Sequence, residues 1–207
     1  MAQIGIYGGS FNPIHIGHIS LAEWIVAHTS LDEIWLMVTP NNPLKDLGFL
    51  IDQNKRLQWA KTAITGHDKI VVSDFEFHLP QPSYTIHTLQ QLQQAYPQHT
   101  FSLVIGTDNL TIFHHWKDWQ TILRDFPIYV YPRKGDEIAQ LQQTYPAVTI
   151  LTEAPLYPIS STQIRQELAL GHDMRQWVPE TIYEEVKETY HQAGIDLLTR
   201  YDTLNLV

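Results

Sequence analysis

Hydrophobic residues along this chain form two kinds of pattern that alternate from one end to the other. Short continuous apolar runs bounded by turn-forming residues are typical of strands buried in a parallel sheet. Six runs are of this kind, over 4–7, 34–38, 70–72, 101–105, 128–131 and 148–151. The stretches between them carry apolar residues at every third or fourth position, which predicts helices. This alternation predicts an α/β fold, with a parallel sheet of five to six strands and helices on both faces.

Capping residues and helix breakers set the expected bounds of the helices. Asp52 is expected to cap one helix, and a later helix is expected over 160–171, from three hydroxyl residues to a glycine. The last helix is expected over 179–191, starting at a proline. A chain of 207 residues with this organisation predicts a single domain, 1–193, followed by a C-terminal tail, 194–207.

The segments that follow the strands are the expected place for a ligand. In parallel sheets of this type, ligands bind beyond the carboxyl ends of the strands. That rule brings to one edge of the sheet the segments 8–18, 40–45, 74–85, 106–116, 132–133 and 160–165. Their composition is also the least ordinary in the chain, so both observations predict the site at this edge.

Composition and charge exclude several kinds of function. The chain has no cysteine, which excludes disulfides, thiolate metal sites and a cysteine nucleophile. A formal net charge of −9 disfavours a nucleic-acid polymer as partner, but it allows a small phosphorylated ligand, which needs only local positive charge. Eleven histidines are present without an H-E-x-x-H motif, and we expect no zinc site. The chain has no long apolar run and no basic-then-apolar leader, so we expect a soluble, cytoplasmic protein with no membrane partner.

The most unusual stretch is 4–18, where an apolar run leads through a glycine pair into a helix. Gly8 and Gly9 allow the backbone to approach a phosphate, and the helix N-terminus offers unpaired N–H groups and a positive dipole. His15 and His18 add hydrogen-bond donors at the first turn of that helix. The spacing matches neither a dinucleotide fingerprint nor a P-loop. On spacing alone, a phosphate site and a glycine-rich turn with two surface histidines are equally good interpretations.

A second polar segment lies late in the chain, at Ser160, Ser161 and Thr162, with Arg165 one turn further on. Three hydroxyls at a helix start can cap the backbone or bind an anion, and an arginine can clamp phosphate oxygens as a fork. Taken alone, this pattern favours plain helix capping.

Taken together, H-x-G-H near the start and I-S-S-T-x-x-R late in the chain resemble the nicotinate and nicotinamide mononucleotide adenylyltransferases of the nucleotidyltransferase superfamily. The resemblance to the bacterial nicotinate mononucleotide adenylyltransferases extends from about Ile4 to Pro179. The further matching residues are Gly8-Gly9-Ser10-Phe11, the Asn-Pro-x-Lys run of Asn42 to Lys45, Tyr84-Thr85 with Thr88-Leu89, Gly106-x-Asp108 with Trp116, and Pro132-Arg133-x-Gly135. Two positions depart from the usual pattern. Asn12 stands where many relatives carry aspartate, and Leu44 stands where histidine often precedes the lysine.

The resemblance implies a Rossmann-like nucleotidyltransferase fold and a set of site residues. His15, His18 and Arg165 would be the catalytic residues, and no protein residue is expected to be a metal ligand. ATP and its phosphates would be bound by Gly8, Gly9, Ser10, Phe11, Lys45, Gly106, Asp108, Arg133, Ser160, Ser161 and Thr162. The pyridine nucleotide would be bound by Tyr84, Thr85 and Trp116, whose flat indole suits stacking on a pyridine ring.

The implied reaction joins ATP and nicotinate mononucleotide to give deamido-NAD (nicotinate adenine dinucleotide) and pyrophosphate, in NAD biosynthesis. Mg²⁺ would enter with ATP as the cofactor. Two alternatives stay open: nicotinamide mononucleotide or another phosphate acceptor on the same fold, and a non-catalytic nucleotide-binding module. The sequence is compatible with a monomer or a homodimer.

Overall fold

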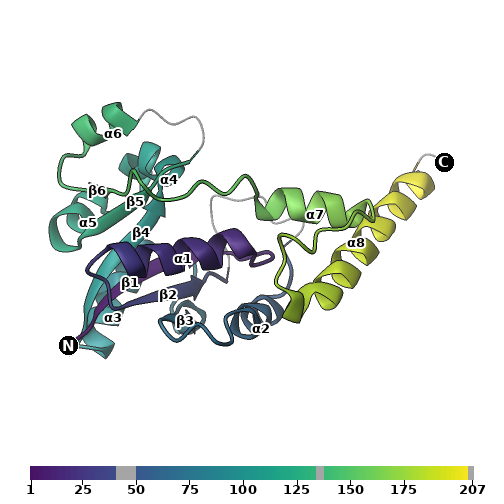
Figure 1. Ribbon diagram of the computed structural model, residues 1–207, viewed down its shortest axis with the longest axis horizontal. Helices are drawn as coiled ribbons and strands as arrows, with labels where there is room; N and C mark the ends of the chain where they lie inside the picture. Colours follow the sequence, from purple (N-terminus) through teal and green to yellow (C-terminus); the bar gives the residue numbers. More distant parts are fainter. Residues whose placement is uncertain (41–49, 134–137, 205–207) are drawn as a thin grey trace.

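The computed structural model describes residues 1–40, 50–133 and 138–204, and over 195–204 it describes the helical backbone alone. A six-stranded sheet forms its centre, with every strand parallel to its neighbours, in the order β3-β2-β1-β4-β5-β6 (Figure 1). The strands are β1 (Gln3–Gly9), β2 (Glu33–Val38), β3 (Ile70–Ser73), β4 (Thr100–Gly106), β5 (Ile128–Tyr131) and β6 (Thr149–Ile150). All six predicted strands are confirmed.

Helices alternate with these strands, as the hydrophobic pattern predicts. They are α1 (Ile16–His28), α2 (Gln53–Ala63), α3 (Thr85–Ala95), α4 (Thr107–Thr111), α5 (Trp119–Asp125), α6 (Ile138–Thr144), α7 (Ser161–Ala169) and α8 (Tyr183–Leu204), with short 3₁₀ turns η1 (Phe75–His78), η2 (Phe113–His115) and η3 (Glu180–Ile182). The Asp52 side chain caps α2 as expected, because Oδ1 accepts from the backbone N–H groups of Asn54 and Lys55 at 2.9 and 3.2 Å.

Two apolar cores lie on opposite faces of the sheet. Successive side chains of a strand point to opposite faces, so β1 contributes to both cores. Ile4 and Ile6 pack in one core with residues of α3, α4 and α5, and Tyr7 packs in the other with residues of α1, α2, α7 and α8. Helices therefore cover both faces of the parallel sheet, and the predicted Rossmann-like architecture is confirmed.

The centre of the sheet holds the point where the strand order reverses. β2 and β3 lie on one side of β1, whereas β4, β5 and β6 lie on the other. In such sheets the loops after the two central strands separate, and the space between them receives the ligand. The loop after β1 and the loop after β4 are therefore the expected walls of a site.

The C-terminal part of the chain differs from the sequence-based expectation. The last helix was expected to end near His191, but α8 continues to Leu204. Gly194, expected to begin a tail, lies inside this helix because it packs against α7: an added Cβ would lie 2.9 Å from the Cβ of Ala169. The glycine thus permits a close helix contact here instead of ending the helix. The division into a domain, 1–193, and a tail, 194–207, stays a prediction.

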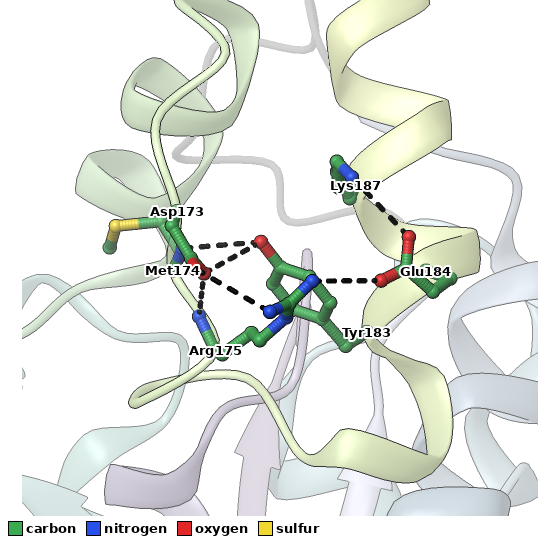
Figure 2. Close-up of polar contacts among 6 residues, drawn as sticks. All are labelled: Asp173, Met174, Arg175, Tyr183, Glu184 and Lys187. Carbon is green, nitrogen blue, oxygen red and sulfur yellow. Dashed lines mark hydrogen bonds and ion pairs between the residues drawn. The ribbon is translucent and has the colours of Figure 1, made fainter.

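A group of polar contacts fixes the start of α8 to the segment that follows α7 (Figure 2). The Tyr183 hydroxyl donates to Oδ1 of Asp173 at 3.0 Å and accepts from the backbone N–H of Met174 at 3.3 Å. Arg175 pairs with Glu184 at 3.5 Å. Tyr183 therefore fastens the start of α8 to the segment between α7 and α8. Within the described residues, no helix is both long and apolar enough to cross a membrane.

Candidate active site

The loop between β1 and α1 is shaped by one residue of unusual backbone geometry, Phe11. Phe11 is buried and has a φ of +44°, in the left-handed region that side chains rarely adopt. Its ring folds back over Gly9, where an added Cβ would lie 3.0 Å from the ring. An added Cβ on Gly8 would meet no described atom within 4 Å, so the strand end is open on that side. Gly8 is exposed and Gly9 and Ser10 are partly exposed, so this part of the loop is open to solvent, as a phosphate loop requires.

His15 and His18 lie together at the N-terminus of α1. Their rings stack with centroids 3.6 Å apart and planes inclined by 26°. The backbone N–H of His15 donates to Nδ1 of His18 at 3.2 Å. Because Nδ1 accepts this bond, the neutral imidazole of His18 carries its proton on Nε2. The half-buried ring therefore presents an N–H donor on its outer edge.

His15 is buried, and its surroundings keep the ring neutral. Burial, and then the positive charge of Arg133, lower the pKa of His15 to about 3. Its Nδ1 atom is buried and has no hydrogen-bond partner among the described residues. His15 therefore acts as a neutral group, and among the described residues Arg133 and Arg165 supply positive charge to this site.

A cavity of about 100 Å³ opens beside the two histidines. Its lining comes from β1, the first turns of α1, the end of β5 and a late loop, and consists of Tyr7, His15, Gly17, His18, Leu21, residues 131–133 and residues 155–159. Gly17 brings the helix close to the late loop, since an added Cβ would lie 3.0 Å from the Cβ of Tyr157 and 3.1 Å from the His15 ring. Any larger residue at position 17 would have to displace one of these neighbours.

Arg133 is held at the mouth of this cavity by several contacts. Its backbone N–H donates to Oγ1 of Thr107 at 2.8 Å, and Nη2 donates to the Tyr131 hydroxyl at 3.3 Å. Nε lies 3.7 Å from Oδ1 of Asp108, one of the residues expected to bind ATP. Asp108 follows Gly106, the last residue of β4. The two strand-end segments predicted to share one edge are thus joined by an ion pair.

The second polar segment reaches the first one at the start of α7. Oγ of Ser161 donates to the carbonyl oxygen of Pro13 at 2.9 Å, across 148 residues of sequence. Nη1 of Arg165 donates to the carbonyl oxygen of Asn12 at 2.8 Å, and its Nη2 donates to Oγ1 of Thr162 at 3.2 Å. The fold therefore brings the two sequence motifs together at one loop.

Ser160 has the capping role that the sequence pattern alone favours. It is the N-cap of α7, and its Oγ accepts from the backbone N–H of Gln163 at 3.2 Å. The three hydroxyls are thus divided between a cap, a tether to the loop and a contact with arginine. Their predicted roles toward ATP stay predictions.

Arg56 is a buried residue of the site that the sequence pattern does not reveal. Arg56 is 0% exposed, and its hydrogen bonds to the described residues all go to backbone carbonyls. Nη1 contacts the oxygens of Ser10 and Thr39, Nη2 donates to Pro40 at 2.9 Å, and Nε donates to Ile51 at 2.8 Å. One guanidinium therefore joins the loop after β1, the end of β2 and the segment before α2.

Asn12 and Tyr190 form a second buried contact beneath the loop. The Tyr190 hydroxyl, from α8, donates to Oδ1 of Asn12 at 2.7 Å. The same oxygen accepts from the backbone N–H of Ile51 at 3.3 Å. Asn12, the departure from the family pattern, is 4% exposed and uses its side chain to hold protein segments together.

The residues expected to bind a pyridine ring lie around the start of α3. Tyr84 is its N-cap, Thr85 is its first residue, and the Tyr84 ring lies under Nζ of Lys117, 4.7 Å from the ring centroid. The neighbouring Trp116 is half-buried against Phe113, at 5.4 Å between ring centroids. The structure therefore brings the two predicted aromatic segments near each other.

A buried carboxyl lies under the start of α3. Glu76 accepts from Oγ1 of Thr88 at 2.8 Å and from Oγ of Ser83 at 3.4 Å. Burial raises the pKa of Glu76, and the two hydroxyl bonds oppose that shift.

Lys45 and Leu44, from the predicted phosphate-contacting run, lie outside the described residues. The described part of the chain contains no group of three or more histidine, aspartate and glutamate side chains that could hold a metal ion.

Comparisons with known proteins agree with this geometry. The family model described as "Cytidylyltransferase-like" matches residues 6–167. A Bacteroides fragilis protein named "Probable nicotinate-nucleotide adenylyltransferase" is 46% identical over 184 residues, which cover 89% of this chain and 90% of that protein. A Flavobacterium johnsoniae protein of the same name is 42% identical, over 89% of this chain and 95% of its own length.

The fold is also found among solved structures. The Plasmodium falciparum nicotinic acid mononucleotide adenylyltransferase complexed with NaAD superposes with a TM-score of 0.76 at 22% sequence identity, over 92% of this chain and 98% of that one. At that identity the likeness concerns the fold, whereas the family assignment depends on the relatives that share more than 40% of their residues with this chain. This chain belongs to the cytidylyltransferase-like family and, within it, to the nicotinate-nucleotide adenylyltransferases.

Proposed function

We propose that this chain transfers the adenylyl group of ATP to nicotinate mononucleotide, giving nicotinate adenine dinucleotide and pyrophosphate in NAD biosynthesis. One observation supports this proposal above the others. Ser161 and Arg165 contact the backbone of the loop that leads into His15, so the two motifs form one polar surface at the sheet edge. The names of relatives at 42–46% identity support the same reaction and the same acceptor.

The reaction requires positioning and charge neutralisation more than proton transfer. A 5′-phosphate oxygen of the mononucleotide attacks the α-phosphorus of ATP, a P–O bond forms there, and the bond to the β-phosphate oxygen breaks. Pyrophosphate leaves with the electron pair. The nucleophile is already an anion at neutral pH, so no general base is needed. The neutral state of His15 is compatible with this mechanism, because neither histidine has to accept a proton.

The chain's own residues fit distinct parts of ATP. The Nε2–H of His18, which carries the proton when Nδ1 accepts from His15, would donate to an α-phosphate oxygen, on which charge increases in the transition state. Arg165 is fixed in orientation by its bonds to Asn12 and Thr162, and it lies beside Ser161, where it would hold the β- and γ-phosphates. Arg133, which lines the cavity, and its ion-pair partner Asp108 would contact a phosphate and the ribose hydroxyls.

Mg²⁺ fits this site as an ion carried by ATP. Mg²⁺ commonly binds through substrate phosphates and water, with few protein ligands. The hydroxyls of Ser161 and Thr162 and the guanidinium of Arg165 suit phosphate oxygens, so these residues would hold the triphosphate that carries the ion. The ion, when bound to the triphosphate, supplies charge neutralisation. Ser161, Thr162 and Arg165 would position the phosphates to which it is bound.

The acceptor would bind between the start of α3 and Trp116. Unpaired N–H groups at a helix N-terminus suit a carboxylate, which nicotinate has and nicotinamide lacks. Thr85 opens α3 at this point, and Trp116 supplies a flat half-buried ring. This arrangement favours the acid over the amide as acceptor.

The test is pyrophosphate release from ATP and Mg²⁺, measured side by side with nicotinate mononucleotide and with nicotinamide mononucleotide. We expect rapid release with the acid, slow release with the amide, and product of the mass of nicotinate adenine dinucleotide. The reverse preference would overturn the acceptor and keep adenylyl transfer. Binding of both substrates without any release would overturn the enzyme assignment.

A further inference from the structure

Tyr190 of α8 reaches the underside of the loop that carries the proposed phosphate contacts. The residue is 3% exposed, and its ring lies 6.0 Å from that of Trp59 in α2. Its hydroxyl donates to Oδ1 of Asn12 at 2.7 Å, across 178 residues of sequence. Burial raises the pKa of Tyr190 far above its ordinary value, so the hydroxyl stays a donor at all physiological pH values.

Asn12 links Tyr190 to other residues of the site. Its side-chain oxygen also accepts from the N–H of Ile51, and its backbone oxygen accepts from Arg165. The next residue, Pro13, accepts from Ser161. A movement of Asn12 would therefore displace the phosphate loop and Arg165 together.

We propose that Tyr190 is a positioning residue for adenylyl transfer. Its hydroxyl acts through Asn12 to hold residues 9–13 and the Arg165 side chain in their positions. The inference rests on the proposed function. Tyr190 lies beyond the stretch that the cytidylyltransferase-like family model matches, residues 6–167. A segment outside the shared family region thus completes the active site of this chain.

A purely structural role for Tyr190 would be to fasten α8 to the rest of the protein, and Tyr183 provides a control for it. Tyr183 lies on the same helix, is also 3% exposed, and makes two hydrogen bonds through its hydroxyl (Figure 2). Those bonds reach Asp173 and Met174, which follow α7, and they do not involve the phosphate loop. Tyr183→Phe therefore loosens α8 without changing the support of Asn12.

The experiment compares Tyr190→Phe with Tyr183→Phe and with the wild type, using pyrophosphate release for activity and thermal unfolding for stability. Both variants keep the ring and lose one hydroxyl, so both should fold with modestly lowered midpoints. We expect Tyr190→Phe to lower kcat by about tenfold with a smaller change in KM, since misplaced groups weaken transition-state contacts. Tyr183→Phe should keep wild-type kcat. Equal kcat values for the two variants would overturn the proposal.

A double-mutant cycle with Asn12→Ala tests the route of the effect. If Tyr190 acts through the Asn12 side chain, Tyr190→Phe should change kcat less than about twofold once that side chain is absent. Additive effects would overturn the proposed route. Hydrogen exchange of the backbone amides of residues 9–12 provides a readout that does not depend on activity: it should be faster in Tyr190→Phe and unchanged in Tyr183→Phe. Unchanged exchange in both would also overturn the proposal, whereas an inactive wild type would overturn the proposed function alone.

Discussion

The backbone N–H of His15 donates to Nδ1 of His18, and this bond places the proton of the neutral imidazole on Nε2, the atom proposed to donate to the α-phosphate. His18→Ala removes that donor from the site. We expect kcat to fall by about 10²–10³-fold, because a donor aimed at developing charge acts mainly in the transition state. Thermal unfolding should change little, since the ring is half-buried at a helix start. His28→Ala, at the other end of α1, is the control and should keep wild-type kcat; a near-normal rate in His18→Ala would remove His18 from the mechanism.

Trp116 is expected to act in acceptor binding more than in stability. Trp116→Ala should raise the KM for nicotinate mononucleotide by about tenfold, because a stacking surface is lost, and should change the KM for ATP far less. Trp119 is a matched control, because its ring also packs against Phe113, at 6.1 Å. If Trp116→Ala raised both KM values equally, or if Trp119→Ala raised the KM for nicotinate mononucleotide as much, Trp116 would be a packing residue only.

The buried His15 makes stability depend on pH in a definite direction. The pKa of His15 is about 3 in the folded protein, against an ordinary value of 6.5, so between these values the unfolded chain binds more protons. The contribution of His15 is fully present above pH 6.5 and is lost as pH falls toward 3. The free energy of unfolding of wild type and of His15→Gln should be measured by denaturant unfolding at pH 7 and pH 5. Its change with pH should differ between the two proteins by up to about 1.4 kcal/mol per pH unit. Parallel pH dependences would show that His15 protonates normally.

Glu76 should produce the opposite dependence. Burial raises the pKa of this carboxyl above 4.5, so over the window just above 4.5 the folded state binds more protons, and stability falls as pH rises through the folded pKa. Glu76→Gln keeps an acceptor for Thr88 and removes the buried charge. The variant should gain stability relative to wild type at pH 8 and gain nothing at pH 4. A loss at pH 8 would show that the ionised carboxylate is needed by its hydroxyl partners.

Arg56 should be among the most sensitive residues of the chain for folding. Arg56→Lys keeps the charge, but an ammonium group cannot reach carbonyls from several segments at once. We expect the free energy of unfolding to fall by about 2–4 kcal/mol, because buried carbonyl groups lose their donors. Arg124→Lys is the control, since the exposed Arg124 pairs only with its neighbour Asp125 among the contacts described here. Equal midpoints for the two variants would contradict the role given to Arg56.

The sequence predicted the sheet, the edge that carries the site and the two motifs, because each depends on short-range patterns. Strands such as 101–105 are continuous apolar runs, and the glycines and histidines of 8–18 are adjacent in sequence. Patterns of this kind report local backbone requirements directly. The family resemblance then related the two motifs, and the contacts of Ser161 and Arg165 with the first loop confirm that they meet.

Arg56 and Tyr190 could not be found in this way. In sequence Arg56 lies in an amphipathic helix beside Lys55 and has the pattern of a solvated residue. Its burial depends on carbonyls from segments that the sequence does not relate to it. Tyr190 lies 178 residues from its partner, Asn12. The expected end of the last helix was wrong for a similar reason, since the packing of Gly194 against α7 cannot be seen in the sequence.

The strand order of the sheet has a consequence for the chain as it is synthesised. β1 is made first, but its second neighbour is β4, which begins at Thr100. At about 5–20 residues per second, a ribosome needs on the order of ten seconds to make that strand, and the nascent β1 has an unpaired edge for that time. The loop after β1 also lacks its contacts with α7 and Tyr190 until those later residues have been synthesised. A stalled or truncated nascent chain therefore exposes an edge of its first strand before the active site is assembled. Chaperones and proteases can bind such a chain before it is catalytically active.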